Sequence, residues 1–338
     1  MYVFQEQVAL QPYNTFGIAA TARWWFELLD EQQALEFLID NVHAKGPLLI
    51  LGGGSNLLLT GDVQGLVIRN AIRGIEVLKE DDVRVQVRVG AGENWHAFVL
   101  HCLDRGWGGV ENLSLIPGCV GAAPIQNIGA YGVEICEVFD HLEALNLATG
   151  KQRVFTHAEC RFGYRDSAFK HEHKGKYLIT RVALTLSKQP ILNTSYGAIG
   201  EELARRTASP TIRDVSEVVC DIRRSKLPDP AEIGNAGSFF KNPVIARSHY
   251  ERLVEAYPAL PQYPAGEGQV KVPAAWLIEA CGWKGRRFGN YGVHKNQALV
   301  LVNYGGASGA DIYRLSGEIL DSVRERFGIV LEREVNVV

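Results

Sequence analysis

Two glycine-rich segments constrain the fold of this chain more than any other feature of its sequence. The first, Gly-Gly-Gly-Ser-Asn at 52–56, directly follows the apolar run 47–51. The second, at 117–132, is nearly free of charged side chains. Glycine makes up 35 of the 338 residues, about a tenth, against an average of roughly 7%. Many backbone positions must therefore turn steeply or let another group approach closely.

Length and composition are those of a globular protein with two or three domains and a large core. With 46% hydrophobic and 22% charged residues, disordered and coiled-coil classes are excluded. The formal net charge of −3 offers no basic field for nucleic acid or a membrane surface. Because the first residues lack a signal-peptide pattern and no apolar run approaches the ~18 residues of a membrane span, we expect a soluble, cytoplasmic protein.

Several enzyme classes lose their support because their motifs are absent. The six cysteines include no C-x-x-C pair, which argues against a zinc or redox motif, and a disulfide framework is not expected in a chain this long. There is no GxxxxGK[ST], GxGxxG, HExxH or GxSxG sequence, so a kinase, a metallohydrolase and a serine hydrolase are disfavoured. His171-Glu172-His173 is interpreted as a solvated turn, and no metal is expected.

Mixed strand and helix patterns predict an α+β fold. Strands are indicated at 48–51, 83–89 and 177–186, with a hairpin over 142–155. Helices are expected to follow Asp30, Asn94 and Thr211, and to cover 274–281 and 311–327, the last capped by Ser308 and ended by Gly328. The final segment, 329–338, is predicted to be a strand. Two prolines within 226–230 cannot continue a helix and indicate a domain boundary.

The two glycine segments suggest a nucleotide ligand. Consecutive glycines at 52–56 form a nest suited to a pyrophosphate, although such a segment alone is more often a tight loop between strands. The second segment shifts the balance, because long irregular loops within a compact domain are usually functional. Its small residues would let a flat aromatic ligand lie on the backbone. A dinucleotide with a large ring system, such as FAD, would use both loops.

Three further patterns carry polar groups. Arg161 and Arg165 could grip a carboxylate together, or simply form a solvated face. Ser238 could donate a proton, although a turn or capping role is commoner for a serine in this setting. Glu332 and Glu334 are two residues apart on the predicted terminal strand, so their side chains would share one face. The same arrangement would occur on a strand that merely faces solvent.

In this order, the motifs resemble those of the UDP-N-acetylenolpyruvoylglucosamine reductases, flavoenzymes of bacterial peptidoglycan precursor synthesis. The resemblance runs through nearly the whole chain. No single motif is specific, but the set is. The matching stretches are NTFGI at 14–18, LGGGSN at 51–56, IPGCVGAAPIQNIGAYG at 116–132, YRDS at 164–167, KLPDP at 226–230 and GNAGSFFKNP at 234–243.

The resemblance implies a vanillyl-alcohol-oxidase/PCMH-type FAD-binding fold in two N-terminal subdomains, 1–70 and 71–225, followed by a C-terminal α+β substrate-binding domain at 226–328. The PCMH-type region would span about 17–188, with a lid segment near 190–200, and the terminal strand at 329–338 would carry the catalytic acid. The implied reaction is the reduction of UDP-N-acetylglucosamine enolpyruvate to UDP-N-acetylmuramate, with FAD as cofactor and NADPH as hydride donor.

The family's functional positions are also implied residue by residue. Ser238 matches the proton donor, and Arg165 and Glu334 match the residues that polarise the substrate carboxylate. Substrate contacts are implied for the lid tyrosine Tyr196 and for Lys226, Asn242 and Gln297. Positions implied to hold non-covalent FAD are Gly52, Gly53, Gly54, Ser55, Asn56, Pro117, Gly118, Gly121, Ala122, Asn127, Gly129, Ala130, Tyr131 and Gly132.

The terminal motif departs from the family pattern. It usually reads LEPEV, whereas this chain has LEREV at 331–335, with Arg333 in place of the proline. Assigning the acid to Glu334 depends on its neighbour Val335, and Glu332 is the alternative.

Two other functions stay open. An oxidase of the same flavoprotein superfamily would pass electrons to oxygen. Some such enzymes link FAD covalently to a histidine or cysteine, and Cys119, within one of the glycine loops, is the candidate here. A UDP-sugar-binding module would bind nucleotide sugar without a flavin. The sequence leaves open the oligomeric state, with a monomer favoured, and the choice between NADPH and NADH.

Overall fold

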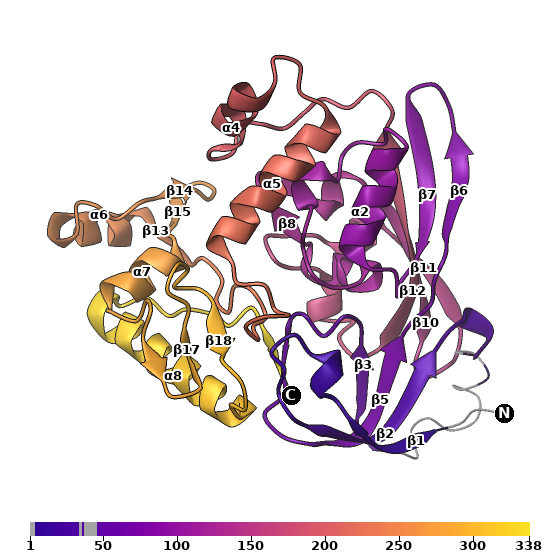
Figure 1. The fold of residues 1–338 in the computed structure, drawn as a ribbon, viewed down its shortest axis with the longest axis horizontal. Coiled ribbons are helices and arrows are strands. Elements are labelled where there is room, and N and C mark those ends of the chain that lie inside the picture. Colours follow the sequence, from indigo (N-terminus) through magenta and orange to yellow (C-terminus); the bar gives the residue numbers. More distant parts are fainter. Residues whose placement is uncertain (1–3, 34–35, 37–45) are drawn as a thin grey trace. The chain divides into compact units, whose positions relative to one another are not determined.

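The computed structural model describes residues 4–33, 36 and 46–338 (Figure 1). The described residues form two compact units. Those within Met1–Val8, Ala22–Gly53 and Val63–Ser225 make up the N-terminal unit, and those within Ala9–Thr21, Gly54–Asp62 and Lys226–Val338 make up the C-terminal unit. The chain passes between the units several times, and its last change, after Ser225, lies beside the proline-rich boundary that the sequence indicates. The finer division at residues 70 and 328 stays a prediction.

Two β-sheets organise the N-terminal unit. The first has the strand order β1-β2-β5-β3, and both β2 and β3 run parallel to β5. The second is antiparallel, with the order β11-β10-β12-β7-β6. The strands are β1 (Gln5–Ala9), β2 (Thr21–Leu28), β3 (Leu48–Leu51), β5 (Val63–Asn70), β6 (Ile75–Glu80), β7 (Arg84–Gly90), β10 (Phe139–Asn146), β11 (Gln152–Thr156) and β12 (Tyr177–Ser187).

Shorter elements complete this unit. A two-stranded ladder joins β8 (Gly129–Ala130) to β9 (Val133–Glu134), and turns of 3-10 helix occur at 111–113, 120–122, 124–126, 135–137 and 168–170. The helices are α2 (Trp95–Asp104), α3 (His157–Cys160), α4 (Ile199–Arg206) and α5 (Ile212–Lys226).

The periodic patterns of the sequence predicted most of these elements correctly. The strands at 48–51, 83–89 and 177–186 and the hairpin over 142–155 are confirmed as β3, β7, β12 and the β10–β11 pair. Asn94 caps α2, because its side-chain oxygen accepts a hydrogen bond from the Ala97 N–H at 2.9 Å. Asp30 likewise accepts from the Gln33 N–H at 2.8 Å, but the rest of the helix expected there lies outside the described residues.

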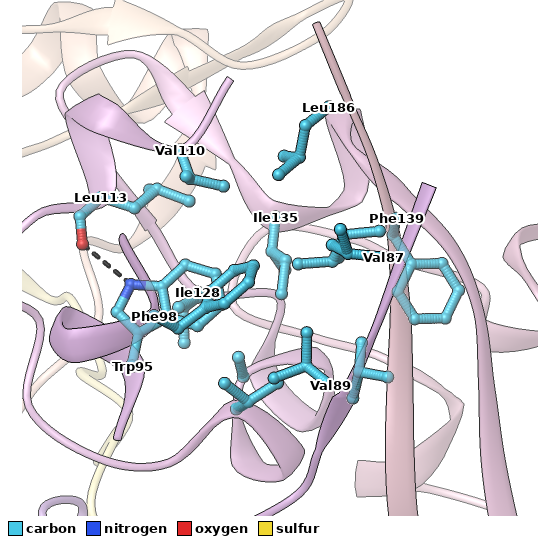
Figure 2. Close-up of a cluster of buried hydrophobic side chains, with 14 of the residues drawn as sticks. Val87, Val89, Trp95, Phe98, Val110, Leu113, Ile128, Ile135, Phe139 and Leu186 are labelled. Atoms are coloured by element: carbon cyan, nitrogen blue, oxygen red, sulfur yellow. Dashed lines mark hydrogen bonds between the residues drawn. The ribbon is translucent and has the colours of Figure 1, made fainter. Parts of the chain in front are cut away.

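A large apolar core lies between α2 and the five-stranded sheet (Figure 2). The alternating valines of β7, at 85, 87 and 89, are fully buried in it, as period-two side-chain alternation requires. From α2, Trp95 and Phe98 enter the same core. Figure 2 shows the Trp95 indole N–H donating to the Leu113 carbonyl, at 2.9 Å, so the one polar atom of this buried ring is satisfied.

Replacing Trp95 with phenylalanine should lower the free energy of unfolding by about 2–4 kcal/mol. The change removes the hydrogen bond to the Leu113 carbonyl and leaves a small cavity in a tightly packed core. Urea denaturation measures the loss. Tyr263→Phe, at an exposed ring, serves as the control and should stay within about 0.5 kcal/mol of the unsubstituted protein. Equal stability of the two variants would contradict this account of the core.

The C-terminal unit is built from short strands and helices. One antiparallel sheet has the order β13-β15-β14 and another the order β16-β17-β18. Its elements include β4 (Leu57–Leu58), β13 (Val244–Ala246), α6 (Arg247–Ala256), β14 (Tyr263–Pro264), β15 (Gln269–Lys271), α7 (Ala274–Ala280), β16 (Arg287–Phe288), β17 (Tyr291–Val293), β18 (Leu301–Asn303), α8 (Gly309–Phe327) and β19 (Asn336–Val337).

Helix α8 has the capping serine and the terminating glycine that the sequence predicts, although it begins at Gly309 and not at Asp311. The Ser308 hydroxyl accepts a hydrogen bond from the Asp311 N–H at 3.1 Å and so caps the first turn. Gly328, with φ of 63°, ends the helix in the left-handed conformation that glycine adopts without strain.

The terminal segment corrects the prediction of one strand over 329–338. Only Asn336–Val337 forms a strand, β19, parallel to β4, while Arg333 forms an isolated antiparallel bridge with Phe240. The segment thus pairs first with residues 239–241 and then with residues 56–58. Because it changes partner and direction of pairing, no single ladder runs along it.

Candidate functional site

In the N-terminal unit, the first two residues of the 52–56 glycine segment pack against the 117–132 loop. A Cβ atom at Gly53 would lie 2.8 Å from the Cα of Gly118, which is closer than real contacts allow. A Cβ at Gly52 would meet the Cβ atoms of Cys119 and Ala122 at 3.7 and 3.8 Å. Only glycine at position 53 therefore lets the two loops approach as they do.

The 117–132 loop is fixed to the turn that precedes α2. Trp95 N–H donates to the Gly118 carbonyl at 3.0 Å, and Val120 N–H donates to the Glu93 carbonyl at 2.9 Å. A Cβ at Gly121 would lie 2.4 Å from the Cβ of Ala91. The loop is thus held by its backbone and by close packing.

Strained backbone gathers in and beside this loop. Leu115, Asn127, Tyr131 and Arg165 have φ values of 58°, 45°, 51° and 52°, a region that residues other than glycine seldom occupy. Such strain concentrates at functional sites. The buried side chain of Asn127 donates to a Glu134 carboxylate oxygen at 2.7 Å, so it braces the loop from within.

The outer part of the loop fits a flat ligand. Pro117, Ala122 and Gly132 are exposed, and no acidic or basic side chain occurs between 117 and 132. Such a surface of small, uncharged residues suits an aromatic ring system, and the adjoining glycine segment suits its phosphates. The residues present therefore fit FAD.

Arg165 is hydrogen-bonded to the 117–132 loop. Its Nη2 donates to the Gly129 carbonyl at 2.5 Å, and its guanidinium carbon lies 5.4 Å from the centre of the Tyr164 ring. Arg161, by contrast, forms an ion pair with Glu172. The two arginines thus have different partners here, and their joint grip on one carboxylate stays a prediction.

Tyr196 precedes α4 and remains 51% exposed. Its ring lies 6.0 Å from that of Tyr131, nearly perpendicular to it. The segment just before it, residues 191–195, lines a pocket of 580 Å³ together with Glu111 and Glu137. An exposed aromatic ring beside the glycine loop is consistent with the lid position that the sequence implies.

Ser238, in the C-terminal unit, is placed by two neighbouring chain segments. It forms an antiparallel bridge with Val300, and the next residue, Phe239, donates its N–H to the Leu299 carbonyl at 2.8 Å. The Phe239 carbonyl in turn accepts from the Glu334 N–H at 2.8 Å. Residues 95 positions apart in the chain are thus brought together, with buried Phe239 holding the half-exposed serine in place.

The two candidate acids differ in their surroundings. Glu332 is 72% exposed in its side chain and forms an ion pair with Lys241 at 3.1 Å. Glu334 is half-buried, and its carbonyl accepts a hydrogen bond from the Asn56 amide at 3.2 Å. Only the antiparallel bridge of Arg333 with Phe240 lies between them, and the expectation that both acids share one face stays a prediction. The surroundings favour Glu334 as the functional acid.

Gly54, Ser55 and Asn56, the second half of the glycine segment, belong to the C-terminal unit. Gly54 has φ of 61°, and a Cβ there would lie 2.0 Å from the Tyr13 carbonyl oxygen. The Asn56 carbonyl accepts from the Asn336 N–H at 3.1 Å. Asn56 therefore holds the terminal segment that carries Glu334.

Comparison with known proteins decides the family. A family model described as the C-terminal domain of UDP-N-acetylenolpyruvoylglucosamine reductase matches residues 229–338, and one described as an FAD binding domain matches residues 29–156. The UDP-N-acetylenolpyruvoylglucosamine reductase of Pseudomonas putida is 52% identical over 335 residues, which cover 99% of this chain and 98% of that protein. This chain belongs to the UDP-N-acetylenolpyruvoylglucosamine reductase family.

Solved structures agree with this membership. The crystal structure of the reductase (MurB) from Thermus caldophilus is 25% identical, has a TM-score of 0.67, and covers 100% of this chain and 99% of its own. A solvent-stable cholesterol oxidase has a TM-score of 0.50 at 12% identity, over 98% of this chain and 86% of its own, which shows likeness of fold alone. The predicted α+β flavoprotein fold is confirmed, and the enzyme is an FAD-dependent oxidoreductase.

The polar residues expected to hold substrate are oriented by their own backbone surroundings. The Asn242 side-chain oxygen accepts from the Ala274 N–H at 2.9 Å, where α7 begins. The Gln297 side-chain oxygen accepts from the Leu299 N–H at 3.3 Å. Lys226, the last residue of α5, is exposed. Their contacts with substrate stay predictions.

Cys119 does not favour a covalent flavin link. Burial raises the pKa of its thiol, and a thiol needs its thiolate form to react as a nucleophile.

Sequence reasoning missed two basic side chains, the partly buried Arg223 and the buried His294. Each has a buried nitrogen, Nε of Arg223 and Nδ1 of His294, with no hydrogen-bond partner among the residues that the structure describes. The helical period offered one indication for Arg223, since it follows the apolar Val219 by four residues. No comparable pattern distinguishes His294.

The described residues offer neither a metal-binding cluster nor a membrane-spanning helix. In the part of the chain that the structure describes, no cluster of three or more histidine, cysteine or acidic side chains could hold a metal ion. Within the same part, no helix is both long and apolar enough to span a membrane.

Proposed function

We propose that this enzyme reduces UDP-N-acetylglucosamine enolpyruvate to UDP-N-acetylmuramate with NADPH as the donor. The step belongs to peptidoglycan precursor synthesis, and through it to cell-wall biogenesis, cell shape and cell division. Family membership over 99% of the chain supports the reaction. The structural observation that carries it is the hydrogen bond between Glu334 N–H and the Phe239 carbonyl, because it sets the proposed acid beside the proposed proton donor Ser238.

The residues proposed to hold FAD are those of the two glycine segments, at 52–56 and 117–132. When bound, FAD supplies the two-electron transfer from NADPH to the enolpyruvyl double bond. Gly53 keeps the two loops in close contact, and Asn127 and the Trp95 N–H keep the longer loop in shape. Preformed loops of this kind bind a rigid ligand without a cost of ordering.

Ser238 is proposed to donate its hydroxyl proton to the carbon next to the substrate carboxylate. Negative charge that develops on that carboxylate during reduction would be stabilised by the Arg165 guanidinium, and Glu334 would steady the enol-like species. A neutral hydroxyl is a weak acid, so its position must matter more than its acidity. The backbone bridge between Ser238 and Val300 supplies that fixed position.

The nucleotide part of the substrate is assigned to Tyr196, Lys226, Asn242 and Gln297. A lysine suits a diphosphate as a point charge. The side-chain oxygens of Asn242 and Gln297 already accept hydrogen bonds from backbone N–H groups, so their NH₂ groups remain as donors to the substrate. The proposal places the enzyme in the cytoplasm, acting as a monomer on small molecules and not on nucleic acid.

Replacing Ser238 with alanine should slow reoxidation of the reduced flavin by the enolpyruvyl substrate by about 10²–10⁴-fold, the usual contribution of a general acid. Reduction of the flavin by NADPH should be unchanged. Anaerobic stopped-flow absorbance measures the two half-reactions separately. The exposed Ser209 provides a control as Ser209→Ala, with both rates unchanged. Equal rates for Ser238→Ala and the unsubstituted enzyme would remove Ser238 from the mechanism.

A further inference from the structure

Arg333 stands where the family pattern has a proline, directly before the proposed acid Glu334. Its side chain is directed onto α8, which belongs to the same C-terminal unit. The Arg333 Nε donates to the Ser316 hydroxyl at 2.8 Å, and the guanidinium carbon lies 4.5 Å from the centre of the Tyr313 ring. The residue that departs from the family motif therefore connects the terminal segment to α8.

The Ser316 hydroxyl is a fixed partner for this arginine. Ser316 is fully buried, and its hydroxyl donates to the Tyr313 carbonyl at 2.6 Å, so its oxygen is left to accept from Arg333. Helix α8 is itself capped at both ends, by Ser308 and Gly328. A guanidinium that is both hydrogen-bonded and placed against an aromatic ring has little freedom to move. The helix thus gives the terminal segment a rigid attachment.

The backbone pairing of the terminal segment is short at this point. Two backbone hydrogen bonds, of 2.8 and 2.9 Å, pair residues 332–334 with residues 239–241. Arg333 lies between these bonds, opposite the buried Phe240 in an isolated bridge. From residue 336 the segment pairs instead with residues 56–58, whereas an ordinary strand keeps its partner for about 5–6 residues. The contacts of Arg333 with α8 add a further attachment immediately beside Glu334.

We propose that Arg333 is a positioning residue for Glu334. By attaching residues 332–334 to α8, it holds the Glu334 carboxylate where the enol-like species forms, an inference that rests on the proposed function. Placement matters because a displacement of about 1 Å lowers a catalysed rate by on the order of 10²-fold. A proline at 333 would restrain the segment in another way, since its ring fixes its own φ and keeps the preceding residue extended. In this chain a side-chain contact takes over the restraint that a proline ring would supply.

Three substitutions at position 333 separate placement from charge. Arg333→Ala should slow reoxidation of the reduced flavin by the enolpyruvyl substrate by about 10- to 10²-fold, while flavin content and flavin reduction by NADPH keep their values. Arg333→Pro should recover most of the lost rate although it removes the charge. No described residue accepts a hydrogen bond from the Arg333 N–H that a proline lacks. Arg333→Lys keeps the charge but not the planar group with its Nε donor, so it should remain slow.

Anaerobic stopped-flow absorbance measures both half-reactions in each variant. Arg324→Ala is the matched control, because this exposed arginine of α8 pairs with Asp321 at 2.9 Å, and both of its rates should stay unchanged. Failure of Arg333→Pro to recover the rate would overturn the inference, and rescue by Arg333→Lys alone would show that charge matters instead of placement. An unchanged rate in Arg333→Ala would overturn it as well, as would an equal loss in both half-reactions.

A double substitution tests whether Arg333 acts through Glu334, and it decides alone if Arg333→Pro fails to retain its flavin. When Glu334→Gln is already present, adding Arg333→Ala should slow reoxidation no further, because the carboxylate that Arg333 positions is gone. A further loss as large as that of Arg333→Ala in the unsubstituted enzyme would contradict the inference. If instead the unsubstituted enzyme is not reoxidised by the enolpyruvyl substrate, the proposed function itself fails, whatever the variants do.

Discussion

Replacing Glu334 with glutamine should nearly abolish reoxidation of the reduced flavin by the enolpyruvyl substrate, with a loss of about 10³–10⁴-fold, near the upper end for a residue that handles a proton or a developing charge. Glutamine keeps the shape of the side chain and the backbone hydrogen bond from residue 334 to the Phe239 carbonyl. FAD should therefore remain bound, and its reduction by NADPH should keep its rate. Anaerobic stopped-flow absorbance follows both half-reactions.

The same chain supplies the matched control for this variant. Glu332 lies two residues away, but its side chain is largely exposed and pairs with Lys241. An exposed ion pair of this kind contributes little, so Glu332→Gln should leave both half-reactions unchanged. If the loss appeared in Glu332→Gln and not in Glu334→Gln, the acid would have been assigned to the wrong residue of the LEREV motif.

Replacing Gly53 with alanine should weaken FAD binding by about 5- to 150-fold, the equivalent of the roughly 1–3 kcal/mol typical of overpacking. The new Cβ would lie 2.8 Å from the Cα of Gly118, and backbone cannot move aside as a flexible side chain can. The two loops must then separate, and the surface that they form together is lost. The ratio of flavin to protein absorbance after gel filtration measures the effect.

Gly61→Ala tests whether any glycine substitution near this segment has the same effect. A Cβ at Gly61 would meet nothing within 4 Å, so flavin content should equal that of the unsubstituted enzyme. Full flavin content in Gly53→Ala would mean that the close contact between the glycine loops does not support the cofactor.

Local patterns predicted the regular elements well because the same residues determine period, burial and capping. The alternating valines of β7 and the Ser308 and Gly328 ends of α8 are examples. The terminal segment could not be predicted in this way. This segment pairs first with residues 239–241 and then with residues 56–58, both distant in sequence. The alternation of side chains does not indicate where a segment changes its pairing partner.

The candidate site, like the fold, could be predicted only in part from the sequence. The glycine segments were recognisable because they combine backbone freedom with absence of charge, and their close contact at Gly53 and Gly118 follows that expectation. The separate partners of Arg161 and Arg165 were not predictable from their spacing. Nor was the orphaned Nε of Arg223, because a sequence does not show which charges a fold leaves without a counterion.

The central claim is most directly tested by the visible absorption spectrum of the purified enzyme, recorded without oxygen through two additions. Flavin bands should be present at the start, be bleached by NADPH, and be restored by UDP-N-acetylglucosamine enolpyruvate. Bands that NADPH bleaches but only oxygen restores would indicate an oxidase. A colourless protein that cannot be reconstituted with FAD would contradict the account of the glycine loops and leave only binding of a nucleotide sugar.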